Sequence, residues 1–213
     1  CMMDCADIAL MVNVAPDARR FLGIWLVRIA MAGACRIALT GAPGTGKSTL
    51  ALEIQRRGFE VESVEGLAEK YECIEDADPS DGARPIDVGK LCRALESEWL
   101  AELSDELFIE GHLSHSLPVD ASIILRCSPL ILEERLAARG YSNEKVSANV
   151  DWEILGGPWN EIGGSFPCLE IDASSERTDV IIGKIVEWMA DGFKPMDPDS
   201  SIDWVTEEER RHV

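Results

Sequence analysis

Residues 37–54 read IALTGAPGTGKSTLALEI, an apolar run followed by a glycine-rich turn and then by a segment with helical spacing. Residues 41–48 match the pattern G-x-x-x-x-G-K-[ST] without a mismatch, and this pattern requires a strand before it and a helix after it. Glycines let the backbone curl so that successive N–H groups point at phosphate oxygens, and the start of the helix adds its positive end. The stretch therefore predicts a site for a nucleoside triphosphate.

Seven residues of the loop and of the first helical turn are expected to bind the triphosphate. They are Gly41, Gly44, Thr45, Gly46, Lys47, Ser48 and Thr49. In this motif the lysine reaches the β and γ phosphates and the following hydroxyl binds Mg²⁺. Lys47 is therefore a predicted catalytic residue, Ser48 a predicted metal ligand, and Thr49 is placed for the α phosphate.

The rest of the chain alternates between short apolar runs and segments with helical spacing. Strands are expected at 35–40, 59–64, 106–112, 121–127 and 167–173. Helices are expected at 47–57, 65–72, 86–103, 130–140, 142–155 and 176–190. Such alternation predicts a parallel sheet, and the apolar run SIIL (122–125) fits a strand buried on both sides. The predicted fold is an α/β P-loop NTPase with a five-stranded parallel sheet and helices on both faces.

The two ends of the chain differ in composition from its centre. The apolar run FLGIWLVRIAMAGA (21–34) is short, is interrupted by Arg28 and does not fit a membrane span. We expect the domain to occupy residues 31–190, with Met31 as its first residue and 1–30 as an extension outside it. Residues 191–213 are rich in Pro, Asp and Glu and predict an acidic tail, in which Trp204 is expected to be a weak anchor onto the domain.

The charge balance of 20 Lys and Arg against 39 Asp and Glu gives a net charge of −19. A field of this sign repels nucleic acid, so broad electrostatic binding of DNA or RNA is excluded. Two explanations for the acidity stay open, a salt-adapted host and a merely soluble acidic protein. The seven cysteines are scattered without C-x-x-C spacing, which argues against a zinc site and a disulfide framework and predicts a reducing compartment. The expected location is cytoplasmic, and no membrane partner is expected.

Sequence features elsewhere in the chain narrow the class of nucleotide-binding protein. A GTPase needs the guanine-binding pattern N-K-x-D, which the sequence lacks. Large motor ATPases need a longer chain than 213 residues. The remaining class is that of small phosphotransferases, in which a lid closes over the transferring phosphate and excludes water.

Four segments carry a more specific resemblance. They are RIALTGAPGTGKSTL (36–50), PIDVGKL (85–91), FIEGHLSH (108–115) and ILRCSPLILEERLAARGYSNEKVSANV (124–150). Together they resemble the atypical adenylate kinase family, adenylate kinase isoenzyme 6 and its archaeal relatives, over about residues 35–190. The resemblance implies a short-lidded nucleoside monophosphate kinase that uses ATP and Mg²⁺, phosphorylates AMP or another nucleoside monophosphate, and also hydrolyses ATP. It further implies a role in maturation of the small ribosomal subunit through a small-subunit ribosomal protein.

The resemblance also assigns segments and residues. It puts the monophosphate-binding segment at about 63–86, the lid at about 138–149 and the lid arginine at Arg139. The family's acid-x-His element after the third strand, often Asp-x-His, falls on Glu110, Gly111 and His112. The longer Glu110 keeps a carboxylate that can bind Mg²⁺ or its water, so Glu110 and His112 join Lys47 and Arg139 as predicted catalytic residues. The paired glycines of ILGGPWNEIGG (154–164) depart from the family, in which the helix after the lid tends to continue.

Other charged residues have weaker assignments. Arg126 is expected at the carboxyl edge of the fourth strand, and Arg135 is spaced i, i+4 from Arg139, so both could neutralise the transferred phosphoryl group or form structural ion pairs. His115 is expected on the loop surface. Asp87 is expected to be a helix N-cap with a possible contact to the monophosphate.

Three functions are compatible with these residues. The first is transfer of the γ-phosphoryl group of ATP to AMP. The second is an ATPase that acts in assembly of the small ribosomal subunit with little kinase activity, and the third is a kinase of another small acceptor, such as a shikimate-like hydroxy acid. The acidic stretch EDADPSD (75–81) is poorly suited to an anionic acceptor and tempers the expectation of fast transfer.

Overall fold

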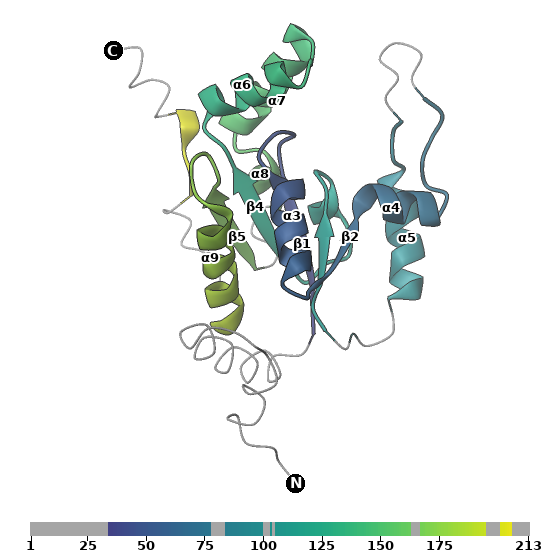
Figure 1. Ribbon diagram of the computed structural model, residues 1–213. Coiled ribbons are helices and arrows are strands. Elements are labelled where there is room, and N and C mark those ends of the chain that lie inside the picture. The colour runs from purple at the N-terminus through teal and green to yellow at the C-terminus, as the bar shows by residue number, and fades with distance from the viewer. Residues whose placement is uncertain are drawn as a thin grey trace.

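The computed structural model describes residues 34–77, 84–99, 103, 105–162, 167–194 and 201–205. Its centre is a sheet of five parallel strands in the order β2-β3-β1-β4-β5 (Figure 1). The strands are β1 (Arg36–Gly41), β2 (Glu60–Ser63), β3 (Leu107–Glu110), β4 (Ala121–Arg126) and β5 (Cys168–Asp172). The five strands and their parallel pairing confirm the predicted sheet.

Helices connect the strands. They are α3 (Lys47–Arg56), α4 (Val64–Lys70), α5 (Val88–Glu98), the 3₁₀ turn η1 (Ser114–Ser116), α6 (Pro129–Ala138), α7 (Asn143–Ile154), α8 (Pro158–Ile162) and α9 (Thr178–Ala190). Asp87 caps α5 by accepting a hydrogen bond from the Lys90 N–H at 2.8 Å, as predicted. Ser128 stands at the N-cap of α6, and its side chain makes no capping hydrogen bond.

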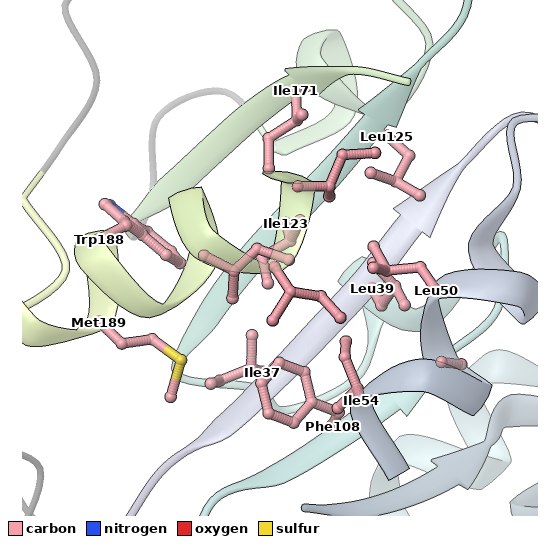
Figure 2. Packing of buried hydrophobic residues seen from close by; sticks show 14 of the residues in the cluster. Ile37, Leu39, Leu50, Ile54, Phe108, Ile123, Leu125, Ile171, Trp188 and Met189 are labelled. Carbon is pink, nitrogen blue, oxygen red and sulfur yellow. The ribbon is translucent and has the colours of Figure 1, made fainter. Parts of the chain in front are cut away.

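One face of the sheet packs against α3 and α9 in the main hydrophobic core (Figure 2). Alternate residues of β1 and β4 point to this face because side chains of a strand alternate between its two sides. They include Ile37, Leu39, Ile123 and Leu125, which meet Leu50 and Ile54 of α3 and Trp188 and Met189 of α9. This packing fixes the start of α3 beside the carboxyl end of β1.

Separate clusters cover the opposite face. Leu107 and Ile109 of β3 pack with residues of α4 and α5, whereas Ile124 of β4 packs with Ile162 of α8 and Cys168 of β5. Helices therefore cover both faces of the sheet, as predicted. None of the helices in the described residues combines the length and apolar character needed to cross a bilayer.

The order of the strands decides where a ligand can bind. From the central strand β1 the sheet extends through β3 on one side and through β4 on the other. Connections that leave the two sides of a central strand open a crevice beyond its carboxyl end, where open α/β sheets bind ligands. Gly41, the last residue of β1, therefore opens the loop 41–48 directly into this crevice.

Candidate active site

The loop between β1 and α3 is tightly closed. The N–H and Oγ1 of Thr45 donate to the Ala42 carbonyl at 3.3 Å and 3.0 Å. Gly44 has a φ of +92°, and a Cβ atom at this position would lie 2.9 Å from Cδ1 of Leu132 in α6. Only glycine permits both this backbone conformation and this approach of α6. The glycine pattern thus shapes the loop and also lets α6 pack against it.

Lys47, the first residue of α3, turns back toward the loop. Its Nζ donates to the carbonyls of Gly41 at 2.9 Å and Ala42 at 2.8 Å. Burial lowers the pKa of Lys47 from 10.5 to about 8, opposed by the nearby Glu110 carboxylate. The ammonium is therefore a poorly solvated cation at the mouth of the crevice, which favours contact with an anion.

Ser48, in the first turn of α3, lies beside Glu110, the last residue of β3. The Ser48 hydroxyl donates to Oε1 of Glu110 at 3.1 Å, although the two residues are 62 positions apart. Mg²⁺ prefers oxygen ligands, and it commonly takes one or two from the protein while the rest come from water and substrate phosphates. A hydroxyl and a carboxylate oxygen at this spacing fit such a site, so these two residues could hold Mg²⁺.

A cavity of about 310 Å³ opens on the other side of the loop. Gly44, Gly46 and Thr49 line it from the loop and α3, and Arg135 and Arg139 line it from α6 and its end. Three further lining residues, Glu176, Thr178 and Ile181, come from the start of α9 and the turn before it. Sequence reasoning missed these three, although the segment after β5 must reach the same edge of the sheet.

The two arginines of α6 differ in their surroundings. Arg135 donates to the Gly44 carbonyl at 3.3 Å and to the Ser174 carbonyl at 2.9 Å, so it joins the loop to the turn after β5. Arg139 is exposed at the C-cap of α6, and its positive charge contributes to lowering the pKa of Lys47. The i, i+4 spacing thus brings both side chains to one cavity, with Arg135 held by carbonyls and Arg139 open to solvent.

The segment 110–115 follows β3 and is tied to the end of β1. The Gly111 N–H donates to the Leu39 carbonyl at 3.2 Å, and the Thr40 hydroxyl donates to the His112 carbonyl at 3.1 Å. The His112 side chain is exposed, but the surrounding protein removes part of its hydration. This desolvation lowers the pKa of His112 most, and the charge of Lys47 lowers it further. A neutral imidazole has one ring nitrogen that can accept a hydrogen bond from water.

Arg126 forms structural ion pairs, the second of its two predicted roles, so the phosphate-binding role is wrong. Its Nε donates to Glu153 Oε1 at 2.6 Å, its Nη2 to the Glu153 carbonyl at 2.7 Å, and its Nη1 to Glu170 Oε1. The guanidinium is 1% exposed and lies on the sheet face away from α3 and α9. Glu170, a charged residue between Leu169 and Ile171 of β5, was the signal in the sequence for a buried partner.

Trp204 and His115 are more buried than predicted. Trp204 is 3% exposed, and its Nε1 donates to Glu153 Oε1 at 3.1 Å, so residues 201–205 return to the Arg126 cluster. His115, expected on the loop surface, is 6% exposed and contacts Thr40 and Glu161. The expectation failed for His115 because Glu161, on α8, is 46 positions away in the sequence.

The predicted substrate segments are partly within the described residues. The segment 63–86 contains α4 and an antiparallel bridge between Ile74 and Ile86, while residues 78–83 lie outside the described part of the chain. The predicted lid 138–149 consists of the end of α6, a turn through Gly140 and the first half of α7. Residues 1–30, and the tail apart from 191–194 and 201–205, also lie outside the described residues.

Comparison with known proteins places this architecture in a family. A model of the AAA domain matches residues 37–156, from β1 to the turn after α7. A protein of Archaeoglobus fulgidus named "Putative adenylate kinase" is 38% identical over 183 residues, which cover 82% of this chain and 94% of that protein. The chain belongs to the atypical adenylate kinase family. A protein of the same name from Methanocaldococcus jannaschii is 35% identical, over 71% of this chain and 84% of that protein.

The fold is also found among solved structures. The crystal structure of TT1252 from Thermus thermophilus superimposes with a TM-score of 0.50 and 17% identity, over 73% of this chain and 98% of that one. Together with the AAA domain match and the sheet order, this likeness confirms the predicted α/β P-loop NTPase fold.

Proposed function

We propose that this atypical adenylate kinase transfers the γ-phosphoryl group of ATP to AMP and hydrolyses ATP as an accompanying activity. The observation that carries the proposal is the pairing of Ser48 with Glu110 at 3.1 Å beside Lys47. It puts a hydroxyl, a carboxylate and a buried ammonium where a triphosphate on the loop would end. The relatives named "Putative adenylate kinase" support adenosine nucleotides as substrates.

Each group has a role that follows from its chemistry. The N–H groups of the loop and of the start of α3 bind the phosphates, and Lys47 exchanges its carbonyl partners for phosphate oxygens. Ser48 and Glu110 would hold Mg²⁺, which neutralises charge on the transferring group. Arg139, exposed at the cavity, is the cation that can meet the negative charge of the phosphoryl group as it moves.

The two substrates enter from different sides of the loop. The 310 Å³ cavity between Arg139 and the start of α9 accepts the nucleoside part of ATP. The acceptor enters beside the segment 110–112, opposite α4, where Val64 packs against Gly111. The charge of Lys47 helps to lower the pKa of His112, and the neutral ring can align a water molecule in the absence of an acceptor, which would give hydrolysis.

A coupled assay with ATP and a panel of nucleoside monophosphates, run beside ATP alone, tests the proposal. We expect ADP formation with AMP to exceed that with ATP alone, and Ser48→Ala and Glu110→Gln to weaken both rates and their Mg²⁺ dependence together. Glu187→Gln, on an exposed part of α9, is the matched control and should change neither rate. Equal rates with and without every monophosphate would remove the kinase part of the proposal.

A second function is favoured by the charge of the chain. With a net charge of −19 and the acidic stretch 75–81 inside the segment assigned to the monophosphate, the protein repels anionic acceptors and attracts basic proteins. We therefore propose as the alternative an ATPase that binds a basic small-subunit ribosomal protein during subunit assembly. Co-purification of such a protein at low salt, with release on ATP addition, would support it. Absence of any ATP-dependent release would count against it.

A further inference from the structure

Three side chains in successive hydrogen-bonding contact, those of Glu161, His115 and Thr40, link α8 to the end of β1. Nε2 of His115 contacts Oε2 of Glu161 at 2.7 Å, and Nδ1 of His115 contacts the Thr40 Oγ1 at 2.8 Å. The same Oγ1 atom lies 3.1 Å from the His112 carbonyl oxygen. The ring of His115 is buried with 3% of its side chain exposed, whereas Glu161 is half exposed. These contacts therefore connect the solvent-accessible carboxylate of Glu161 to the backbone of His112, in the predicted catalytic segment 110–112.

Thr40 has only one hydroxyl proton for two possible acceptors. A hydroxyl donates one hydrogen bond, and the His112 carbonyl can only accept, while a histidine nitrogen can donate or accept. When His115 carries protons on both nitrogens, Nδ1 donates to Thr40, and the Thr40 proton is available to the His112 carbonyl. When Nδ1 is deprotonated, it becomes an acceptor and competes for the Thr40 proton. The Nε2–H donates to Glu161 in both states.

We propose that His115 is a positioning residue whose protonation decides whether Thr40 holds the backbone of His112. With the doubly protonated ring, β1 anchors the segment 110–112 through both the Leu39 carbonyl and the Thr40 hydroxyl. With the neutral ring, the second of these hydrogen bonds is lost. For its effect on phosphoryl transfer this inference rests on the proposed function, because the segment carries Glu110 and His112.

The polar neighbours of His115 come from three parts of the chain. α8 contributes Glu161, the segment 110–113 contributes His112, and β1 contributes the uncharged Thr40. α5 contributes Cys92, whose thiol donates to the Ser116 carbonyl at 3.2 Å. Among the described residues, Glu161 is the carboxylate in direct contact with the ring.

Nuclear magnetic resonance of the full chain labelled with ¹³C,¹⁵N-histidine tests the link. The chain has three histidines, His112, His115 and His212, so His112→Gln and His115→Gln assign all signals. As the pH rises, we expect Nδ1 of His115 to lose its proton and the His112 carbonyl ¹³C signal to shift with the same midpoint. Thr40→Val should abolish the shift of the carbonyl at this midpoint, and Thr40→Ser should retain it.

Charge variants provide a second route that does not need a substitution at the buried Thr40. Glu161→Gln should move both midpoints together and by the same amount, since it removes the charge in direct contact with Nε2. Glu187→Gln, an exposed carboxylate of α9, should move neither. A His112 carbonyl that is unaffected while His115 titrates, a shift that persists in Thr40→Val, or a ring that does not titrate between pH 5 and 9 would each overturn the inference.

Kinetics separates this inference from the proposed function. Loss of the Thr40 hydrogen bond should lower kcat about two- to tenfold, the range expected for one neutral hydrogen bond, with KM for ATP unchanged because the loop still binds the phosphates. Thr40→Val should show this loss at every pH. If the coupling is present in the spectra but no monophosphate is phosphorylated, the proposed function fails while the positioning role of His115 stands.

Discussion

Lys47 is a cation with little contact with water, since it is 7% exposed. It donates to two carbonyls of the loop that precedes it, and burial holds its pKa near 8. Both features are costs in the absence of phosphate, since a buried cation loses solvation that carbonyl dipoles only partly replace. A triphosphate offers full negative charge at the same place. An anion bound at the loop therefore interacts more favourably with Lys47 than it would with a lysine in water.

A pH profile tests this view of Lys47. The kcat/KM for ATP reports groups in the unliganded enzyme, so it should fall as the pH rises through about 8, where Lys47 loses its proton. Lys47→Arg stays charged and should lack this alkaline limb at a lower overall rate. Lys47→Ala should lose on the order of 10² or more in rate at all pH values. An unchanged alkaline limb in Lys47→Arg would assign the titration to another group.

Arg139 should matter more for phosphoryl transfer to AMP, and His112 more for hydrolysis of ATP. Arg139 is exposed at the cavity, so Arg139→Ala should lower kcat for AMP phosphorylation about tenfold or more while ATP binding changes little. His112→Ala should reduce ATP hydrolysis more than AMP phosphorylation, since its ring can accept a hydrogen bond from water. Both reactions are measured for both variants. Equal losses in all four measurements would mean that the two residues only support the fold.

At the scale of elements, local patterns predicted more than long-range ones. Gly58 after α3, Asp87 before α5 and the paired glycines after α7 are local signals. The six predicted helices are all present, whereas α8 was not predicted. The sequence left the role of Arg126 open and misassigned His115, because their partners are 27 to 46 positions away. Which residues meet across such distances depends on the order of strands and on the return of residues 201–205, which periodicity does not reveal.

The same distinction holds for the candidate site. The loop residues were predicted from one contiguous motif, and their strand–turn–helix context is confirmed. The proximity of Glu110 to Ser48 follows from β3 pairing with β1, since parallel neighbours end at the same edge. The Thr40–His115–Glu161 chain joins β1, η1 and α8, three elements that no local pattern relates.

Trp204 connects the returning segment to α7 and should matter for stability. Trp204→Ala removes a ring that is 3% exposed, and we expect the free energy of unfolding to fall by about 3–5 kcal/mol. Trp204→Phe keeps most of the packing but removes the donor to Glu153, so its loss should be smaller. Denaturant titration measures both, and hydrogen exchange should show weaker protection in α7. Equal stability of Trp204→Ala and wild type would mean that the segment is not part of the folded domain.

At the scale of the whole molecule, the sheet and its two layers of helices begin with β1 at Arg36. The described core contacts involve residues from Cys35 onward. A chain that starts at Met31 should therefore fold and bind ATP with the affinity of the full chain. Tm and ATP titration of the two chains compare them directly. An insoluble shorter chain, or one with weaker ATP binding, would show that residues 1–30 belong to the domain.

The net charge of −19 also acts on the whole molecule. Self-repulsion of a compact acidic protein decreases as salt shortens the range of the field, from about 10 Å at 0.1 M to about 3 Å at 1 M. Tm should therefore rise by about 3 °C or more between 0.1 and 1 M KCl, as expected for a salt-adapted protein. The quadruple variant Glu96→Gln, Glu133→Gln, Glu134→Gln, Glu187→Gln removes four exposed charges and should show a smaller rise. A flat response in the wild type would leave simple solubility as the explanation for the acidity. Buried contacts such as the Arg126 cluster are screened much less by salt, so they contribute little to this response.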